Sequence, residues 1–99
     1  MPCAEPSALA VIAAWDEAAR IGPVVEAARR HLPVLVVDDG STDDTAAVAE
    51  LAGADVVCQP TNRGKGEALR RGFAGALERG VEAVVTLDAD GQHDPAEIP

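Results

Sequence analysis

The sequence is short of aromatic residues and of cysteine, and each shortage excludes a class of protein. Trp15 and Phe73 are the only aromatic residues among 99, so a core must be built from aliphatic side chains, chiefly those of Ala and Val. The only two cysteines, Cys3 and Cys58, are too few for a disulfide framework or a four-cysteine zinc site. We therefore expect reduced thiols without a structural role.

Basic residues and long apolar runs are also scarce. Lys and Arg total 8 against 17 Asp and Glu, a net charge of -9, which argues against a nucleic-acid partner. No run approaches the roughly 18 apolar residues of a membrane span, and no basic stretch precedes an apolar one at the N-terminus. We expect a cytoplasmic chain that associates with a membrane only through parts outside this sequence.

What the sequence does have is an alternation of short apolar runs with amphipathic stretches. Hydrophobic residues make up 47%, enough for one packed domain over residues 1–99. The apolar runs predict strands at residues 8–14, 34–37, 54–58 and 81–87, and helices follow the first three. Apolar strands that alternate with helices predict an α/β fold, a Rossmann-like parallel sheet of four strands with helices on both faces.

The helix ends carry recognisable signals. Asp16 is expected to cap the first helix, and Ser41 or Thr42 the second, at residues 43–52. Gly53 and Gly80 stand where a left-handed residue ends a helix. The third helix, residues 67–79, is expected to bury one apolar face, which holds Ala68, Leu69, Phe73, Ala76 and Leu77.

Polar residues follow each predicted strand, and in a parallel sheet these positions share the carboxyl edge, where such sheets bind ligands. Asp88 and Asp90 could converge there on a divalent cation through oxygen ligands, although a solvated acidic turn has the same composition. A calcium loop of the EF-hand type is excluded, because Gly91 is fourth and Pro99 twelfth counting from Asp88. His93 is best explained as a surface turn residue.

Two further loops offer groups for a nucleotide. Asp38 or Asp39 could accept hydrogen bonds from a base or ribose; the alternative is that Asp39 caps its own turn. Lys65, between Gly64 and Gly66 at a helix start, could reach a phosphate or be part of a solvated basic face. The loop is neither a P-loop nor a dinucleotide fingerprint.

Trp15 could stack on a base or pack at the rim of the fold. A phosphorylation receiver is disfavoured, because its acidic residues follow different strands.

Four stretches, in this order and spacing, resemble family 2 glycosyltransferases of the GT-A fold, and most closely the polyprenyl-phosphate (dolichol-phosphate mannose synthase-like) branch. They are VIAAWDEAARIGPVV, VLVVDDGSTDDTAAVA, NRGKGEALRRGF and VVTLDADGQHDP, and together they cover nearly the whole chain.

The resemblance implies a nucleotide-sugar site to which all four loops contribute residues. Ala13, Trp15 and Glu17 would lie against the base and ribose, and Asp39 would hydrogen-bond the base. Lys65 would face the nucleotide or its phosphates. Mg²⁺ or Mn²⁺ on the diphosphate would be held by Asp88, Asp90 and Gln92.

Two departures from the family matter. Its first loop usually has Pro, Tyr and Asn where this chain has Ala13, Trp15 and Asp16, and a charge at Asp16 would lie near the nucleotide.

The second departure is length, since family catalytic domains are about twice this size. The start signal at Asp94, Pro95 and Glu97 has only a turn behind it, too short for an isolated helix. We therefore expect an N-terminal part of a longer domain, with the catalytic base elsewhere.

The function expected is that of a metal-dependent glycosyltransferase, here its nucleotide-sugar-binding half. It would use a UDP- or GDP-sugar and an acceptor for which a polyprenyl phosphate is one candidate. The alternatives are a nucleotide- or metal-binding module without transfer activity, and a nucleotidyltransferase, which usually has a Gly-rich basic loop that AAWDEAAR lacks. A sheet edge left uncovered by an absent half would favour a homo-oligomer.

Overall fold

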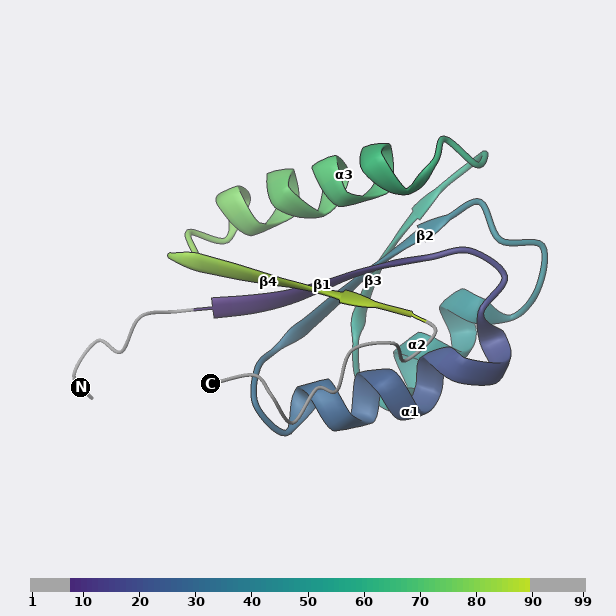
Figure 1. The fold of residues 1–99 in the computed structure, drawn as a ribbon, viewed down its shortest axis with the longest axis horizontal. Helices are drawn as coiled ribbons and strands as arrows, with labels where there is room; N and C mark the ends of the chain where they lie inside the picture. The colour runs from purple at the N-terminus through teal and green to yellow at the C-terminus, as the bar shows by residue number, and fades with distance from the viewer. Residues whose placement is uncertain (1–7, 90–99) are drawn as a thin grey trace.

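The computed structural model describes residues 8–89 and places them in three layers around a parallel sheet (Figure 1). The four strands lie in the order β3-β2-β1-β4. Helices α1 and α2 cover one face of the sheet and α3 covers the other. The predicted α/β fold is confirmed. The elements are β1 (Ala8–Ala14), α1 (Ala18–Arg29), β2 (Val34–Asp39), α2 (Thr45–Ala52), β3 (Asp55–Gln59), α3 (Lys65–Glu78) and β4 (Ala83–Asp88).

The core forms on both faces of the two central strands. All six residues of β2 are buried, and β1 is buried at all but Ala8 and Ala13, whereas the outer strands β3 and β4 are partly exposed. One apolar cluster lies under α1 and α2, where Ile21 and Val25 of α1 are fully buried. A smaller cluster lies under α3. Branched aliphatic side chains thus supply the core that aromatic residues cannot.

Helix α3 approaches the sheet through small residues. Its buried residues are Ala68, Gly72 and Ala76, spaced four apart, and a Cβ at Gly72 would clash with Val11 of β1. The prediction that Phe73 belongs to the buried face is wrong, because 42% of its surface is exposed. Leu77 is likewise exposed, at 79%. The small residues Ala68, Gly72 and Ala76 therefore make the close contact with the sheet, and the large side chains lie beside them.

The helix ends predicted by the glycines are confirmed, and the predicted starts are wrong. Gly53 and Gly80 have φ of 107° and 70°, in the left-handed region. The cap position of the first helix is Glu17 rather than Asp16, and that of the second is Asp44 rather than Ser41 or Thr42; neither residue makes a side-chain cap hydrogen bond. The starts differ because other loops take up these side chains, as described below.

Cys58 lies on the outer strand β3 as a free, exposed thiol. Partial desolvation raises its pKa, and the negative charges of Asp38 and Glu50 add to the effect. A raised pKa disfavours the thiolate, which is the reactive form. The thiol is free, as expected of a reduced cysteine. Among residues 8–89, no helix has both the length and the apolar character needed to cross a membrane.

Candidate functional site

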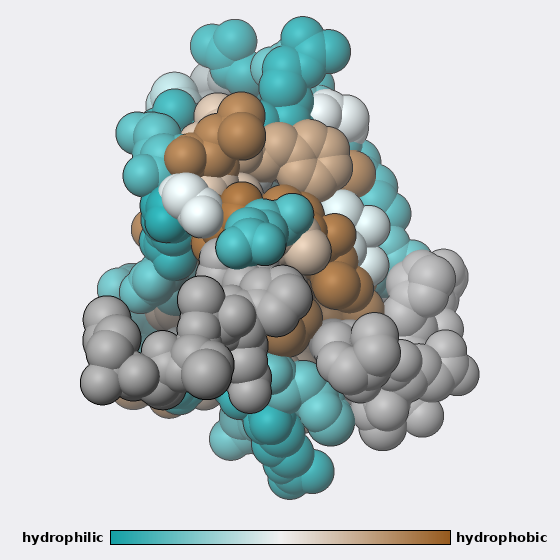
Figure 2. All heavy atoms as spheres, turned by 90° about the vertical axis from the view of Figure 1, so that its left-hand side faces the viewer, coloured by the Kyte–Doolittle hydropathy of each residue, from teal (hydrophilic) through white to brown (hydrophobic). Residues whose placement is uncertain are grey.

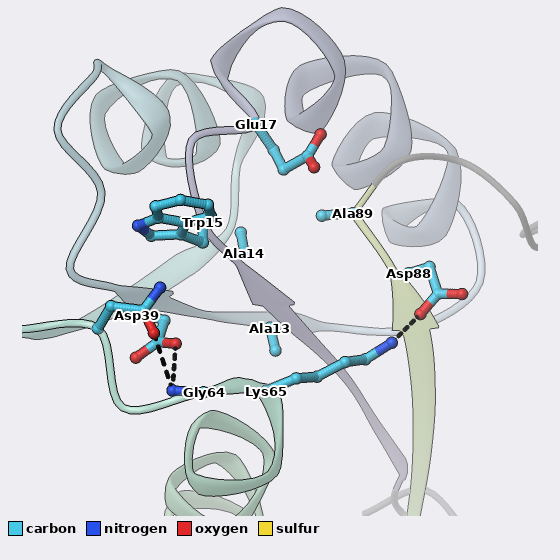
Figure 3. Close-up of a pocket in the computed structure, with 10 residues that line it drawn as sticks. Ala13, Ala14, Trp15, Glu17, Asp39, Gly64, Lys65, Asp88 and Ala89 are labelled. Carbon is cyan, nitrogen blue, oxygen red and sulfur yellow. Dashed lines mark hydrogen bonds and ion pairs between the residues drawn. The ribbon is translucent and has the colours of Figure 1, made fainter.

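A pocket of about 300 Å³ opens at the carboxyl edge of the sheet. It is lined by residues from the ends of β1, β2 and β4 and from the loops that follow β1 and β3 (Figure 3). The lining residues are Ala13, Ala14, Trp15, Glu17, Asp39, Asn62, Gly64, Lys65, Asp88 and Ala89. Every predicted nucleotide-sugar residue that the structure describes is among them.

Strand register brings these residues together. Ala13 of β1 is paired with Asp88, the last residue of β4, on one side, and Ala14 with Asp38 of β2 on the other. Asp39 is in turn paired with Gln59, the last residue of β3. Because all four strands run parallel, their carboxyl ends reach the same edge, and the acidic groups of β2 and β4 face one pocket.

Asp39 organises the loop between β3 and α3. Its side chain is buried, with 3% of the residue exposed. Its Oδ1 accepts hydrogen bonds from Gln59 Nε2 and from the Arg63 backbone N–H, both at 2.8 Å, and Oδ2 accepts one from the Gly64 N–H at 2.9 Å. These three donors occupy three of the roughly four acceptor positions of the buried carboxylate and hold the loop against the end of β2.

The alternative that Asp39 caps its own turn is wrong. The neighbouring Asp38 does so, since its Oδ1 accepts a hydrogen bond from the Ser41 N–H at 3.0 Å. Gly40, which precedes Ser41 in this turn, has a φ of 74°, and a Cβ there would meet the backbone of Thr61 and Asn62. Glycine is therefore required both for the turn and for the close approach of the two loops.

Lys65 and Asp88 form an ion pair across the pocket. Lys65 is the first residue of α3, and its Nζ lies 2.5 Å from Oδ1 of Asp88. Figure 3 shows the lysine side chain extending from beside Gly64 to the end of β4. The Lys65 side chain is 62% exposed and that of Asp88 20% exposed. The pair thus stands at the surface of the pocket, open to ligands.

The charge of Asp16 is directed at the neighbouring loop. Asp16 has a positive φ of 50°, and its Oδ1 accepts a hydrogen bond from the Thr42 N–H at 2.7 Å. Its own N–H donates to Ser41 Oγ at 2.9 Å. Asp16 is also not among the residues that line the pocket. The expectation that this charge lies near a nucleotide is therefore not supported, because the carboxylate joins two loops instead.

Side chains of the loop after β2 also hold the start of α1. Asp43 Oδ2 accepts from the Ala18 N–H at 3.2 Å, and Thr45 Oγ1 accepts from the Glu17 N–H at 2.9 Å. The Thr45 hydroxyl donates to Asp43 Oδ1 and, as the largest of several causes, lowers the pKa of that carboxyl. Sequence reasoning missed this role, although the signal, an acidic residue two positions before a threonine, is present. The network sets the position of Glu17 at the pocket.

The pocket has two chemically different ends. Figure 3 shows the Trp15 indole and Asp39 on one side and the end of Lys65 with Asp88 on the other. Half of the Trp15 surface (51%) is exposed, so its ring is available to a ligand. The first end offers an aromatic face and a hydrogen-bond acceptor, and the second offers one charge of each sign. Asn62, in the loop between β3 and α3, also lines the pocket.

The predicted metal ligands are only partly described. Asp88 lies at the pocket, whereas Asp90 and Gln92 fall outside the described residues. Among residues 8–89 no group of three or more His, Cys, Asp or Glu side chains is placed to hold a metal ion. The chemistry of Asp88 nevertheless fits Mg²⁺ or Mn²⁺, because such ions use one or two carboxylates and complete their shell with water and substrate phosphates.

Comparisons with known proteins point to one family. The family model described as Glycosyl transferase family 2 matches residues 9–99. Polyprenol monophosphomannose synthase of Mycolicibacterium smegmatis is 38% identical over 99 aligned positions, which cover 91% of this chain and 37% of that protein. Undecaprenyl-phosphate mannosyltransferase of Micrococcus luteus is 42% identical, over 67% of this chain and 29% of that protein.

A solved structure shares the fold. Glucosyl-3-phosphoglycerate synthase of Mycobacterium tuberculosis, in complex with Mn²⁺, UDP and glucosyl-3-phosphoglycerate, matches with a TM-score of 0.74 at 32% identity. The match covers 85% of this chain and 33% of that one. The chain thus spans about a third of the length of the relatives that it matches.

Proposed function

Since the chain belongs to glycosyl transferase family 2, we propose that it supplies the donor-binding part of a metal-dependent glycosyltransferase. The donor is a UDP- or GDP-sugar, and the longer protein transfers the sugar to an acceptor. One observation carries the proposal: Trp15, Asp39, Lys65 and Asp88, from four separate segments of the chain, line a single pocket. The roles of these residues stay predictions.

The Trp15 and Asp39 end suits a nucleoside. The exposed indole offers a face on which a base can stack. An ionised carboxylate only accepts hydrogen bonds, so Asp39 favours a base that presents a ring N–H. Uracil and guanine carry a ring N–H on their pairing edge, whereas cytosine and adenine have a ring acceptor there and offer only an exocyclic amino N–H. This chemistry supports UDP or GDP as the nucleotide.

The Lys65 and Asp88 end suits a diphosphate. The Lys65 ammonium can pair with phosphate oxygens, and the start of α3 beside it favours an anion. Asp88, together with Asp90 and Gln92 predicted from the sequence, would hold Mg²⁺ or Mn²⁺. A divalent ion in that place neutralises the charge that builds up on the diphosphate as the bond to the sugar breaks.

The acceptor proposed is a lipid phosphate. The support comes from the names of two relatives, a polyprenol monophosphomannose synthase and an undecaprenyl-phosphate mannosyltransferase. No residue of the described chain is assigned as the base that activates the acceptor. Because the chain spans only 37% of the first of these relatives, transfer is proposed for the longer protein.

We also propose that the chain alone self-associates. The outer strand β4 carries no Lys, Arg or Pro to discourage edge pairing, and Phe73 and Leu77 are exposed on α3. Figure 2 shows hydrophobic residues gathered at the end of the molecule that lies at the left in Figure 1. Sedimentation velocity tests this, and a monomer at high concentration would contradict it.

Calorimetric titration tests donor binding. UDP and GDP are titrated with and without Mn²⁺ into the wild type, Asp88→Asn and a control variant, Asp44→Asn. Asp44 is an exposed carboxylate just before α2, makes no side-chain cap hydrogen bond and does not line the pocket. We expect Mn²⁺ to strengthen UDP or GDP binding in the wild type and the control but not in Asp88→Asn. Binding that is indifferent to Mn²⁺ in all three would count against the proposal.

One second candidate is a binding module without transfer activity, because the described pocket offers groups for a nucleotide and a metal but none that is assigned to activate an acceptor. It binds the same nucleotides in the titration above. The two are separated by incubating UDP- and GDP-sugars with Mn²⁺ and measuring released or transferred sugar. Nucleotide binding without any release of sugar supports the module.

A further inference from the structure

The Lys65–Asp88 ion pair occupies the very carboxylate that the proposed function assigns to a metal. Nζ of Lys65 lies 2.5 Å from Asp88 Oδ1, at the pocket wall. We infer that the Lys65 ammonium takes the place of the metal ion on Asp88 until a donor binds; this inference rests on the proposed function. The ammonium neutralises Asp88 in the ligand-free chain and moves to the donor's diphosphate on binding, so that Oδ1 of Asp88 can bind the metal ion.

Steric and electrostatic reasons make the two states exclusive at Oδ1. A carboxylate oxygen binds Mg²⁺ or Mn²⁺ at about 2.1 Å, so an ion on Oδ1 would stand against an ammonium already in hydrogen-bond contact with that atom. The two like charges would then face each other over a few ångströms. Lys65 must therefore leave Oδ1 before Asp88 can bind a metal through it.

Lys65 is able to leave because little holds it in place. Its side chain is 62% exposed, and Asp88 Oδ1 is the one partner recorded for its ammonium among residues 8–89. Exposed ion pairs of this kind contribute little stability, and the four-carbon stem lets the ammonium swing. Lys65 also begins α3, where the helix dipole disfavours a cation and favours an anion. A diphosphate at this end of the pocket gives Lys65 a stronger, charge-assisted partner.

The exchange has a thermodynamic consequence. A metal ion alone must displace Lys65 from Asp88, whereas after nucleotide binding the lysine is already engaged elsewhere. Lys65 thus adds to the coupling between metal and nucleotide, and by linkage each ligand strengthens the other by the same factor. The device would keep Asp88 from binding free cations when no donor is present.

Calorimetry on Lys65→Met tests the exchange, with Arg63→Gln as the matched control. Arg63 carries the same charge two residues away in the same loop, and only its backbone N–H is bonded to Asp39. The ligands are Mn²⁺ alone, UDP and GDP alone, and Mn²⁺ with saturating nucleotide. We expect Lys65→Met to bind Mn²⁺ alone about fivefold more tightly and the nucleotide about tenfold more weakly than the control. Lys65→Gln, which also removes the charge, should behave alike.

Opposite changes in the two affinities are the diagnostic result, because a damaged fold would weaken both. If Lys65→Met binds Mn²⁺ alone no more tightly than Arg63→Gln does, the exchange is overturned while nucleotide binding stands. If the wild type binds neither Mn²⁺ nor nucleotide, the proposed function fails and this inference fails with it. Thermal unfolding of each variant establishes that all are folded to the same extent.

Discussion

Replacing Asp39 by Asn tests the central claim about the pocket, that one buried carboxylate both holds a loop and presents an acceptor to the base. The substitution keeps the shape of the side chain. It removes the charge and turns one of the two oxygens into an NH₂ group, which only donates. With the amide oxygen at the Oδ1 position, the bonds from Gln59 and Arg63 survive, and the bond from the Gly64 N–H is lost.

The magnitude follows from these bonds. The two surviving bonds change from charge-assisted to neutral, which costs about 1 kcal/mol each. The Gly64 N–H loses one acceptor but keeps Asn62 Oδ1 at 3.0 Å, so its loss costs about 1 kcal/mol. Relief from burying a charge, with Asp39 only 3% exposed, offsets part of this total. We expect a net destabilisation of about 2 kcal/mol.

Urea unfolding followed by the fluorescence of Trp15, the single tryptophan, measures the stability change. UDP and GDP titration measures the binding change, which should be at least tenfold because an NH₂ group would face the N–H of the base. Asp44→Asn, the control used above, should stay within about 0.5 kcal/mol of the wild type. An Asp39→Asn variant as stable as the wild type would refute the loop role, and unchanged nucleotide affinity would refute the role toward the base.

Three further results are expected. Gly72→Ala should destabilise the chain by about 2 kcal/mol because its Cβ would clash with Val11, whereas Gly66→Ala, with open space around its Cβ, should be neutral or stabilise by up to about 1 kcal/mol; urea unfolding of the pair compares them. Asp43→Ala should lower the melting temperature at neutral pH. The lowered pKa means that the Asp43 contribution is full above the ordinary value of 3.8 and is lost as pH falls through the folded value, so melting curves of the wild type and variant should converge in acid, and a constant difference would contradict this. Trp15→Ala should weaken UDP or GDP binding about tenfold by calorimetry if the indole stacks on the base, and unchanged affinity would leave it as a rim residue.

Much of the fold could be predicted because its signals are local. Each strand was indicated by a short apolar run, and β1 was predicted to the residue. Gly53 and Gly80 marked helix ends because the left-handed backbone they adopt depends on the residue itself. The predicted helix starts were wrong because the partners there are distant in the sequence. Asp16 accepts a hydrogen bond from Thr42, 26 residues away, and the Ala18 N–H donates to Asp43, 25 residues away. Local capping rules cannot anticipate such partners.

The sequence by itself determined which residues reach the carboxyl edge, since parallel strands with intervening helices leave one arrangement for their ends. Only the tertiary structure decided how those residues are used. In the structure Asp38 caps the turn after β2, and Asp39 binds the loop between β3 and α3. Asp16 binds the loop after β2, and Lys65 pairs with Asp88. The physical reason is that a hydrogen bond or ion pair forms only when its two atoms are placed to within about a few tenths of an ångström. The packing of the whole sheet sets those positions.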